Sequence, residues 1–210
     1  MYNENQQYIH YNKGSLVFYA LSDYIGEEKL NGVLKSYIKK VGYQNTPYTT
    51  SVELVGLLKE ATPDSLKYVI NDMFETITLY DNRIKKVTSK KLANGKYQVD
   101  IEFEVAKYRA DDQGKRIFKD VKGQTLSYKK KGDAIATNSF PLKDYIEIGV
   151  FNEENLKGKK TEKELHLKKY KIEKIDNKIT IIVDQKPTEV GVDPYNKLID
   201  ANSDDSRKKL

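Results

Sequence analysis

The 210-residue chain contains no cysteine and no tryptophan, and it has only two histidines, His10 and His166. The absence of cysteine excludes disulfides and thiolate chemistry from this chain. The two histidines lie far apart in the sequence and match no familiar spacing of zinc ligands. We therefore expect no metal site, and no autonomous catalysis, from these residues alone.

Long apolar runs are also missing. Charged residues make up 32% of the chain and hydrophobic residues 38%. Since no stretch of about 18 apolar residues is present, we expect no membrane span. The first ten residues are polar where a basic and then apolar secretory signal would stand. They do not resemble a natural start, and we expect the chain to be a piece of something longer.

Positive charge gathers in the second part of the chain. Residues 1–80 carry 7 basic and 9 acidic side chains, whereas residues 81–210 carry 30 basic and 22 acidic ones. The basic part invites a nucleic-acid interpretation, but its lysines alternate with acids, as they do in residues 159–164. Such mixing is typical of the solvent face of a strand, whereas a nucleic-acid groove needs one sign of charge with aromatic side chains. We therefore expect no nucleic-acid partner.

Helical periodicity dominates the first eighty residues, where apolar side chains recur at spacings of three and four. The stripes predict four helices with short links, which together would form an antiparallel helical layer. Gly26 is expected to end the first helix in a left-handed turn. A capping box of Thr50 and Glu53 is expected to open the third helix, and Thr62 with Pro63 the fourth.

A period of two takes over near residue 80. Alternation from Tyr97 to Val105 predicts a half-buried strand. Asn94-Gly95 directly before it is a strong turn signal, so residues 84–92 should pair with it as a hairpin. The further strand candidates are residues 145–151, 165–175 and 179–183. Six or seven short strands without intervening helices favour an antiparallel sandwich.

The patterns together predict an α+β chain in which an N-terminal antiparallel helical layer is followed by an antiparallel β-sandwich. Residues 1–80 are assigned to the helical part, residues 81–201 to the sandwich, and residues 202–210 to a polar tail that we expect to fray. Residues 109–140 are rich in Lys, Asp and Gly. They are expected to form a long excursion that carries one weak hairpin.

The segment Tyr11-Asn12-Lys13-Gly14 leads directly into the first predicted helix. It resembles the Tyr-x-Lys-Gly segment of the gluzincin aminopeptidases, the aminopeptidase N type. The resemblance continues through residues 23–40 and 50–54, and in that family the helical half of the catalytic domain passes into a β-sandwich. Residues 191–200 resemble the last sandwich strand and tail of the bacterial branch in which the peptidase is fused behind a multi-span transporter-like membrane region.

The resemblance implies a role for Tyr11. In that family zinc polarises the scissile carbonyl, and a tyrosine hydroxyl donates to the oxyanion of the tetrahedral intermediate. Lys13 and Gly14 carry over as motif positions only. The H-E-x-x-H motif and the later glutamate, which precede the tyrosine in the family, are missing here. We therefore expect the chain to hold no zinc and to be inactive without the N-terminal catalytic half of its parent.

The parent that the resemblance implies is a zinc aminopeptidase, anchored in a bacterial membrane, that cuts N-terminal residues from peptides. A second class of function stays open, a non-catalytic helical plus β-sandwich binding or interaction module of a membrane-associated protein. On the residues alone, Tyr11 is also compatible with a ring packed on the next helical turn. An adhesion or carbohydrate-binding sandwich would want exposed aromatics on one sheet face, and the chain has no tryptophan to offer.

Overall fold

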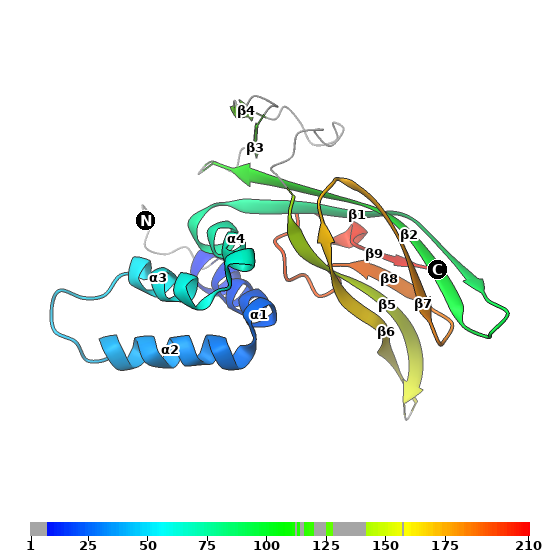
Figure 1. Cartoon of the computed structure of the whole chain (residues 1–210), viewed down its shortest axis with the longest axis horizontal. Coiled ribbons are helices and arrows are strands. Elements are labelled where there is room, and N and C mark those ends of the chain that lie inside the picture. Colours follow the sequence, from blue (N-terminus) through cyan, green and yellow to red (C-terminus); the bar gives the residue numbers. More distant parts are fainter. Residues whose placement is uncertain (1–7, 112, 114–115, 120–124, 128–141, 157) are drawn as a thin grey trace. The chain divides into compact units, whose positions relative to one another are not determined.

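The computed structural model of the chain describes residues 8–111, 113, 116–119, 125–127, 142–156 and 158–210. The chain divides into two compact units, Met1–Ile77 and Thr78–Leu210. Helices form the first unit and antiparallel sheets form the second, so the predicted α+β fold with its helices first is confirmed (Figure 1). Within the described residues, no helix is long and apolar enough to cross a membrane.

The first unit is built from short helices around one apolar core. In chain order they are the π-helical η1 (Tyr8–Lys13), α1 (Gly14–Ile25), α2 (Glu27–Val41), α3 (Ser51–Ala61), the 3-10 helix η2 (Asp64–Leu66), α4 (Lys67–Ile70) and the π-helical η3 (Asn71–Glu75). The buried centre of the core consists of Leu21, Leu30, Leu58, Val69 and Ile70. Gly26 ends α1 as predicted, and its N–H donates to the carbonyl of Ser22. Its φ of 93° is positive, but its ψ of 138° lies outside the left-handed helical region of the predicted turn.

The predicted capping box at the start of α3 is wrong. Thr50 is the N-cap residue in an extended conformation, but its side chain makes no capping hydrogen bond. The hydroxyl of the preceding Thr49 donates instead to the Glu53 carboxylate at 2.7 Å. Lys40 of α2 holds the other Glu53 oxygen at 2.6 Å. Because these two contacts occupy the carboxylate, it is not free to reach back to the backbone at the helix start.

The predicted fourth helix is present, but it is not one continuous α-helix, because η2, α4 and η3 follow one another along it. Thr62 does not cap it, since its hydroxyl donates back to the carbonyl of Leu58 in α3 at 2.7 Å. Leu66 leaves helical dihedrals, with φ −113° and ψ 0°, where η2 meets α4. At the other end, the Thr76 hydroxyl donates to the carbonyl of Asn71 at 2.8 Å, which closes the wide π turn.

The second unit contains two antiparallel sheets (Figure 1). Its strands are β1 (Thr78–Lys91), β2 (Tyr97–Ala110), β3 (Arg116–Lys119), β4 (Thr125–Ser127), β5 (Asp144–Leu156), β6 (Lys159–Ile172), β7 (Asp176–Val183), β8 (Glu189–Val192) and β9 (Arg207–Lys209), with the 3-10 helix η4 (Ser203–Asp205) before β9. The first sheet has the order β1-β2-β3-β4, and β7 also pairs with β2. The second sheet has the order β6-β5-β8-β9.

The hairpin predicted at Asn94-Gly95 joins β1 to β2. Gly95 adopts φ 84°, a left-handed conformation that glycine tolerates, and the Asn94 side chain accepts a hydrogen bond from the N–H of Lys96 at 3.1 Å. The apolar side chains of β2 at Val99, Ile101 and Phe103 are buried, as the period of two predicts. The turn and the alternation therefore fix the register of the longest pair of strands.

The predictions for residues 109–140, the long excursion, and for residues 202–210, the polar tail, compare differently with the structure. Much of residues 109–140 lies outside the described residues, but β3 and β4 pair there as an antiparallel hairpin. The expectation that the tail frays is wrong, because β9 pairs with β8 at the sheet edge. Arg207 is the reason, since its guanidinium lies 4.6 Å from the centre of the Phe151 ring and bonds to Glu189 at 2.8 Å.

Close packing on the second sheet depends on two glycines. Gly149 of β5 and Gly191 of β8 are paired opposite each other, and Pro194 lies against both. A Cβ at Gly149 would lie 3.2 Å from Cγ of Pro194 and closer still to the ring of Phe151. Since Phe151 is buried under the Arg207 guanidinium, its ring has no free space to move into.

We predict that Gly149→Ala destabilises the β unit by about 1–3 kcal/mol, the usual cost of overpacking a close-packed core. Gly56→Ala in α3 is the matched control, because a Cβ there has no atom within 4 Å and alanine favours a helix. Urea unfolding followed by circular dichroism measures both. An unchanged midpoint for Gly149→Ala would contradict the packing described here.

Candidate functional site

Tyr11 lies in η1, a π-helical turn that runs without a break into α1. Its side chain is 72% exposed. A tyrosine packed on the next helical turn would be largely covered, so this ring is available to a ligand or to another chain. π-Helical turns are uncommon and occur frequently at functional sites. Tyr11 is therefore an exposed side chain on a π-helical turn.

Lys13, two residues later, points inward. Its side chain is half-buried, and its ammonium donates to the carbonyl of Thr76 at 3.5 Å. Burial lowers the pKa of Lys13. The rings of Phe18 and Phe74 meet edge to face nearby, with their centres 5.6 Å apart, and join α1 to η3. These contacts hold the start of α1 against η3, the second π-helical segment.

The described residues contain no candidate metal site. Among the residues that the structure describes, no group of three His, Cys, Asp or Glu side chains could hold a metal ion. The side chain of His10 lies outside the described residues. His166 is on β6, where a ring nitrogen lies 3.0 Å from the Tyr170 hydroxyl and burial lowers the histidine pKa. The described residues therefore do not bring together the ligands that a zinc ion needs.

A buried ion pair that the sequence reasoning missed lies between the two sheets. The Lys107 ammonium on β2 donates to both carboxylate oxygens of Asp144 on β5, at 2.9 and 3.2 Å. The Tyr80 hydroxyl on β1 donates to the same carboxylate at 2.8 Å. The side chains of Lys107 and Asp144 are only 6% and 1% exposed. The sequence contains one signal for this burial. Lys107 follows Phe103 and Val105 at the spacing of two that places side chains on the buried face of β2.

A second buried ionic cluster holds the segment that follows β8. The Asp193 carboxylate accepts the backbone N–H groups of Lys197 and Leu198, at 3.1 and 2.8 Å. The Lys197 ammonium donates to Glu147 of β5 at 2.7 Å, and both side chains are buried. Burial of the Asp193 carboxyl raises its pKa to about 7. The motif at residues 191–200 is thus a folded turn fastened to the second sheet.

Asp200 fastens the end of the same segment to the first sheet. Its carboxylate accepts the backbone N–H of Asn82 in β1 at 2.9 Å, and also that of Asn202. Residue 200 forms an isolated parallel bridge with Tyr80. Burial raises the pKa of Asp200 to about 6. Because the protein's own groups bond these carboxylates, both ionic clusters serve the fold, and Tyr11 stays the candidate for chemistry.

Comparison with known proteins assigns neither a family nor a function to this chain. The sequence matches no protein-family model and no curated protein. The role expected of Tyr11 therefore stays a prediction from the Tyr-x-Lys-Gly resemblance.

We predict that Lys107→Met destabilises the β unit by about 3–5 kcal/mol, because it leaves the buried Asp144 carboxylate without its counter-charge. The double variant Lys107→Met/Asp144→Asn removes both charges and should regain much of that loss. Urea unfolding of wild type, both single variants and the double variant gives the coupling energy. Additive losses in this cycle would show that the two side chains do not interact.

The raised pKa of Asp193 predicts a dependence of stability on pH. Its carboxyl titrates near pH 3.9, roughly, in the unfolded chain and near 7 when folded, so the folded state holds the proton more tightly. The resulting stability is complete below about pH 4 and is lost as the pH rises through about 7. Asp193→Asn should abolish this decline, which amounts to at most about 4 kcal/mol.

Unfolding in urea at several pH values measures this effect. Asp184→Asn is the control, because the Asp184 side chain is 81% exposed and should leave the pH profile as it is. If Asp193→Asn and wild type lose stability in parallel between pH values of about 4 and about 7, Asp193 does not titrate as described.

Proposed function

We propose that this chain is the C-terminal part of a zinc aminopeptidase-like protein. In this proposal it supplies the tyrosine that stabilises the oxyanion, one wall of the substrate cleft, and a β-sandwich as a structural platform. The proposal assigns the metal to residues outside this chain. The N-terminal catalytic half of the parent and a peptide substrate are the implied partners.

The exposure of Tyr11 is the observation that carries the proposal. A phenol is neutral near pH 7 and is a good hydrogen-bond donor on a rigid ring, so it suits an oxygen on which negative charge develops. The donor must be open to the substrate, and a ring 72% exposed meets that requirement. The inward contact of Lys13 with Thr76 supports a structural role for the second motif position.

The second candidate is a non-catalytic module that keeps the same fold for binding. Its specific support is the apolar surface of the helical unit, where Ile38 and Val52 are 64% and 77% exposed. Both candidates use an uncovered helical surface. They differ in whether the hydroxyl of Tyr11 matters, and that difference can be measured directly.

We predict that Tyr11→Phe, in a full-length protein that carries this chain, lowers kcat for an aminoacyl-anilide by about 10²–10³, the usual cost of losing one oxyanion donor. Tyr19→Phe is the matched control, because Tyr19 is also an exposed tyrosine and lies on α1. It should keep wild-type activity, and bound zinc should be equal in all three proteins. Wild-type turnover by Tyr11→Phe would favour the non-catalytic module.

The isolated chain provides an independent check. Metal analysis after purification should find no stoichiometric zinc, and anilide hydrolysis should be undetectable. One tightly bound zinc per chain, or hydrolysis that survives a chelator, would refute the division of labour proposed here.

A further inference from the structure

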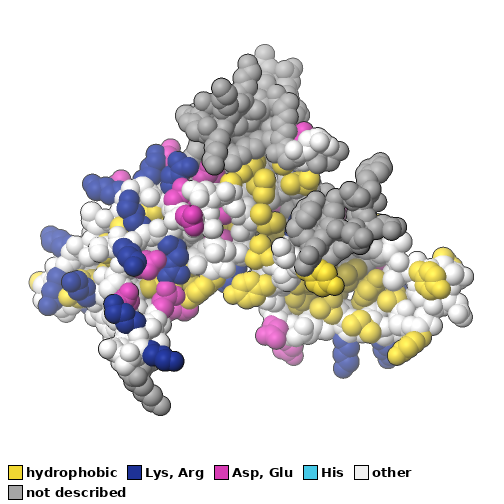
Figure 2. Space-filling view, turned by 180° about the vertical axis from the view of Figure 1, so that it is seen from behind, with side chains coloured by type: hydrophobic (Ala, Val, Ile, Leu, Met, Phe, Trp, Pro, Cys, Tyr) yellow, Lys and Arg dark blue, Asp and Glu magenta, His cyan; other side chains and the backbone are white. Residues whose placement is uncertain are grey.

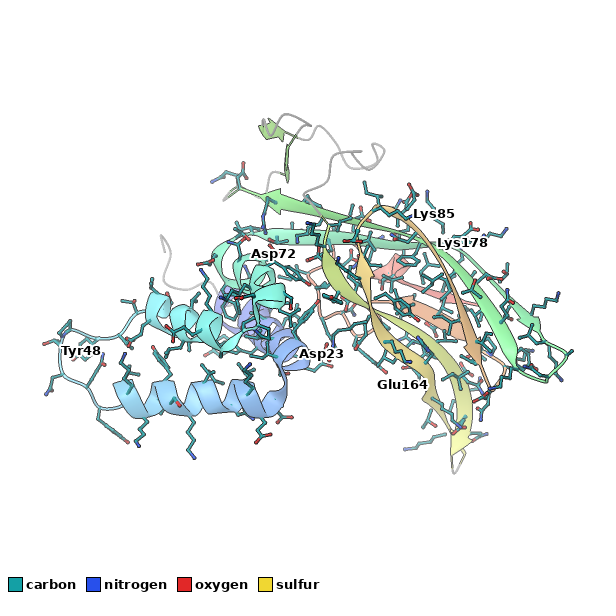
Figure 3. All side chains as sticks on the ribbon, in the orientation of Figure 1. Asp23, Tyr48, Asp72, Lys85, Glu164 and Lys178 are labelled. Carbon is teal, nitrogen blue, oxygen red and sulfur yellow. The ribbon has the colours of Figure 1, made fainter. Side chains whose placement is uncertain are left out.

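The end of the α2–α3 hairpin is an exposed apolar surface. We call residues 38–52 the hairpin tip. Tyr43 is fully exposed, and Tyr48 is 70% exposed. Ile38 and Val52 flank them on the two helices and are exposed as well. Figure 3 shows Tyr48 on the loop between α2 and α3, and Figure 2 shows hydrophobic side chains at this end of the helical unit. Four large exposed apolar side chains within one 15-residue segment are typical of an interaction surface.

The charge pattern of the hairpin is unusual for this chain. Residues 41–52 contain no charged side chain, and this is the longest uncharged stretch in a sequence that is 32% charged. Lysines lie immediately behind it, because Lys35, Lys39 and Lys40 are all exposed on the last turns of α2. The nearest acid is Glu53, which Lys40 and Thr49 already bond. The surface is therefore an uncharged aromatic end with a basic border.

The loop of the tip is organised by its own hydrogen bonds. The Gln44 side chain donates to the carbonyl of Pro47 at 3.3 Å, and its backbone N–H donates to that of Val41. The Thr49 hydroxyl lies 3.0 Å from the hydroxyl of Tyr37. Polar groups that are bonded internally cost less when they leave water. The same loop holds Tyr43 at φ 60°, a left-handed conformation that is uncommon outside glycine and is often kept for function.

These features fit a lipid surface better than a protein partner. Tyrosine is enriched at the membrane–water interface, where its ring enters the apolar region and its hydroxyl stays hydrated. Lysines bordering such a surface extend toward anionic headgroups. Protein interfaces, in contrast, are depleted in lysine. We propose that the hairpin tip docks onto the surface of a bilayer that contains anionic phospholipids, with Tyr43 and Tyr48 inserted at the interface.

Vesicle sedimentation tests the docking, and it is independent of the proposed peptidase role. The full 210-residue chain should sediment with vesicles of phosphatidylcholine and phosphatidylserine, and much less with phosphatidylcholine alone. The double variant Lys35→Gln/Lys39→Gln should partition about twenty-five-fold more weakly, since each lysine near an anionic surface contributes roughly fivefold. The double variant Tyr43→Asn/Tyr48→Ser should lose binding, and asparagine tolerates the left-handed conformation at position 43.

The absence of tryptophan allows a direct readout of insertion. Tyr48→Trp places a single indole at the tip, and its emission should shift to the blue with anionic vesicles. Tyr19→Trp, at an exposed tyrosine of α1 outside the tip, is the matched control and should not shift. Unchanged far-ultraviolet circular dichroism in each variant shows that the helical unit is folded.

Three results would overturn the proposal. The first is an absence of sedimentation with anionic vesicles, and the second is sedimentation that the tip variants do not weaken. The third is self-association of the chain, measured by sedimentation velocity without lipid, that disappears in Tyr43→Asn/Tyr48→Ser. That last result would assign the tip to a contact between two copies of the chain.

Discussion

The buried contact between Lys107 and Asp144 is the constraint on which the β unit depends. It joins β2 of one sheet to β5 of the other, at a depth where both ions have lost their water. Such a pair is tolerated only when its remaining hydrogen-bonding capacity is met, and the Tyr80 hydroxyl contributes to this. Tyr80 is the register partner of Lys107 in the β1–β2 ladder. A slip of one residue would turn it away, so the ion pair also favours a single register.

The segment from Asp193 to Asp200 is also held to both sheets by hydrogen-bonded carboxylates. The Asp193 carboxylate organises a turn, and Lys197 in that turn donates to Glu147 of β5. The Asp200 carboxylate accepts the backbone N–H of Asn82 in β1. The chain can therefore leave the second sheet, bridge to the first, and return as β9. Burial raises the pKa of both Asp193 and Asp200. Proton binding by these two carboxyl groups is therefore linked to the packing of the two sheets.

The sequence predicts correctly those parts of the fold that depend only on the local backbone geometry of a helix end or a turn. Gly26 ends α1 and Asn94-Gly95 turns the first hairpin, because each needs only local backbone geometry. The predictions are wrong where a residue distant in the sequence determines the local structure. Lys40 of the neighbouring helix competes for the Glu53 carboxylate and removes the capping box. Arg207 makes a strand of a polar tail by stacking on Phe151, 56 positions earlier in the sequence. The exposure of Tyr11 belongs to the same class, because a motif does not state which of its residues is covered.

Exposure alone does not separate the two functions that we propose for the helical unit, because Tyr11 and Tyr48 are 72% and 70% exposed. Their surroundings do. Tyr11 belongs to a π-helical turn whose last residue, Lys13, is fixed by its contact with Thr76, and the proposed role needs only its one hydroxyl. Tyr48 shares an uncharged loop with a second exposed ring and a border of lysines, an arrangement that spreads contact over a surface. The first suits a developing oxyanion and the second a lipid interface, so the two tyrosines respond to different experiments: removal of one hydroxyl is decisive for Tyr11, whereas removal of the ring is decisive for Tyr48.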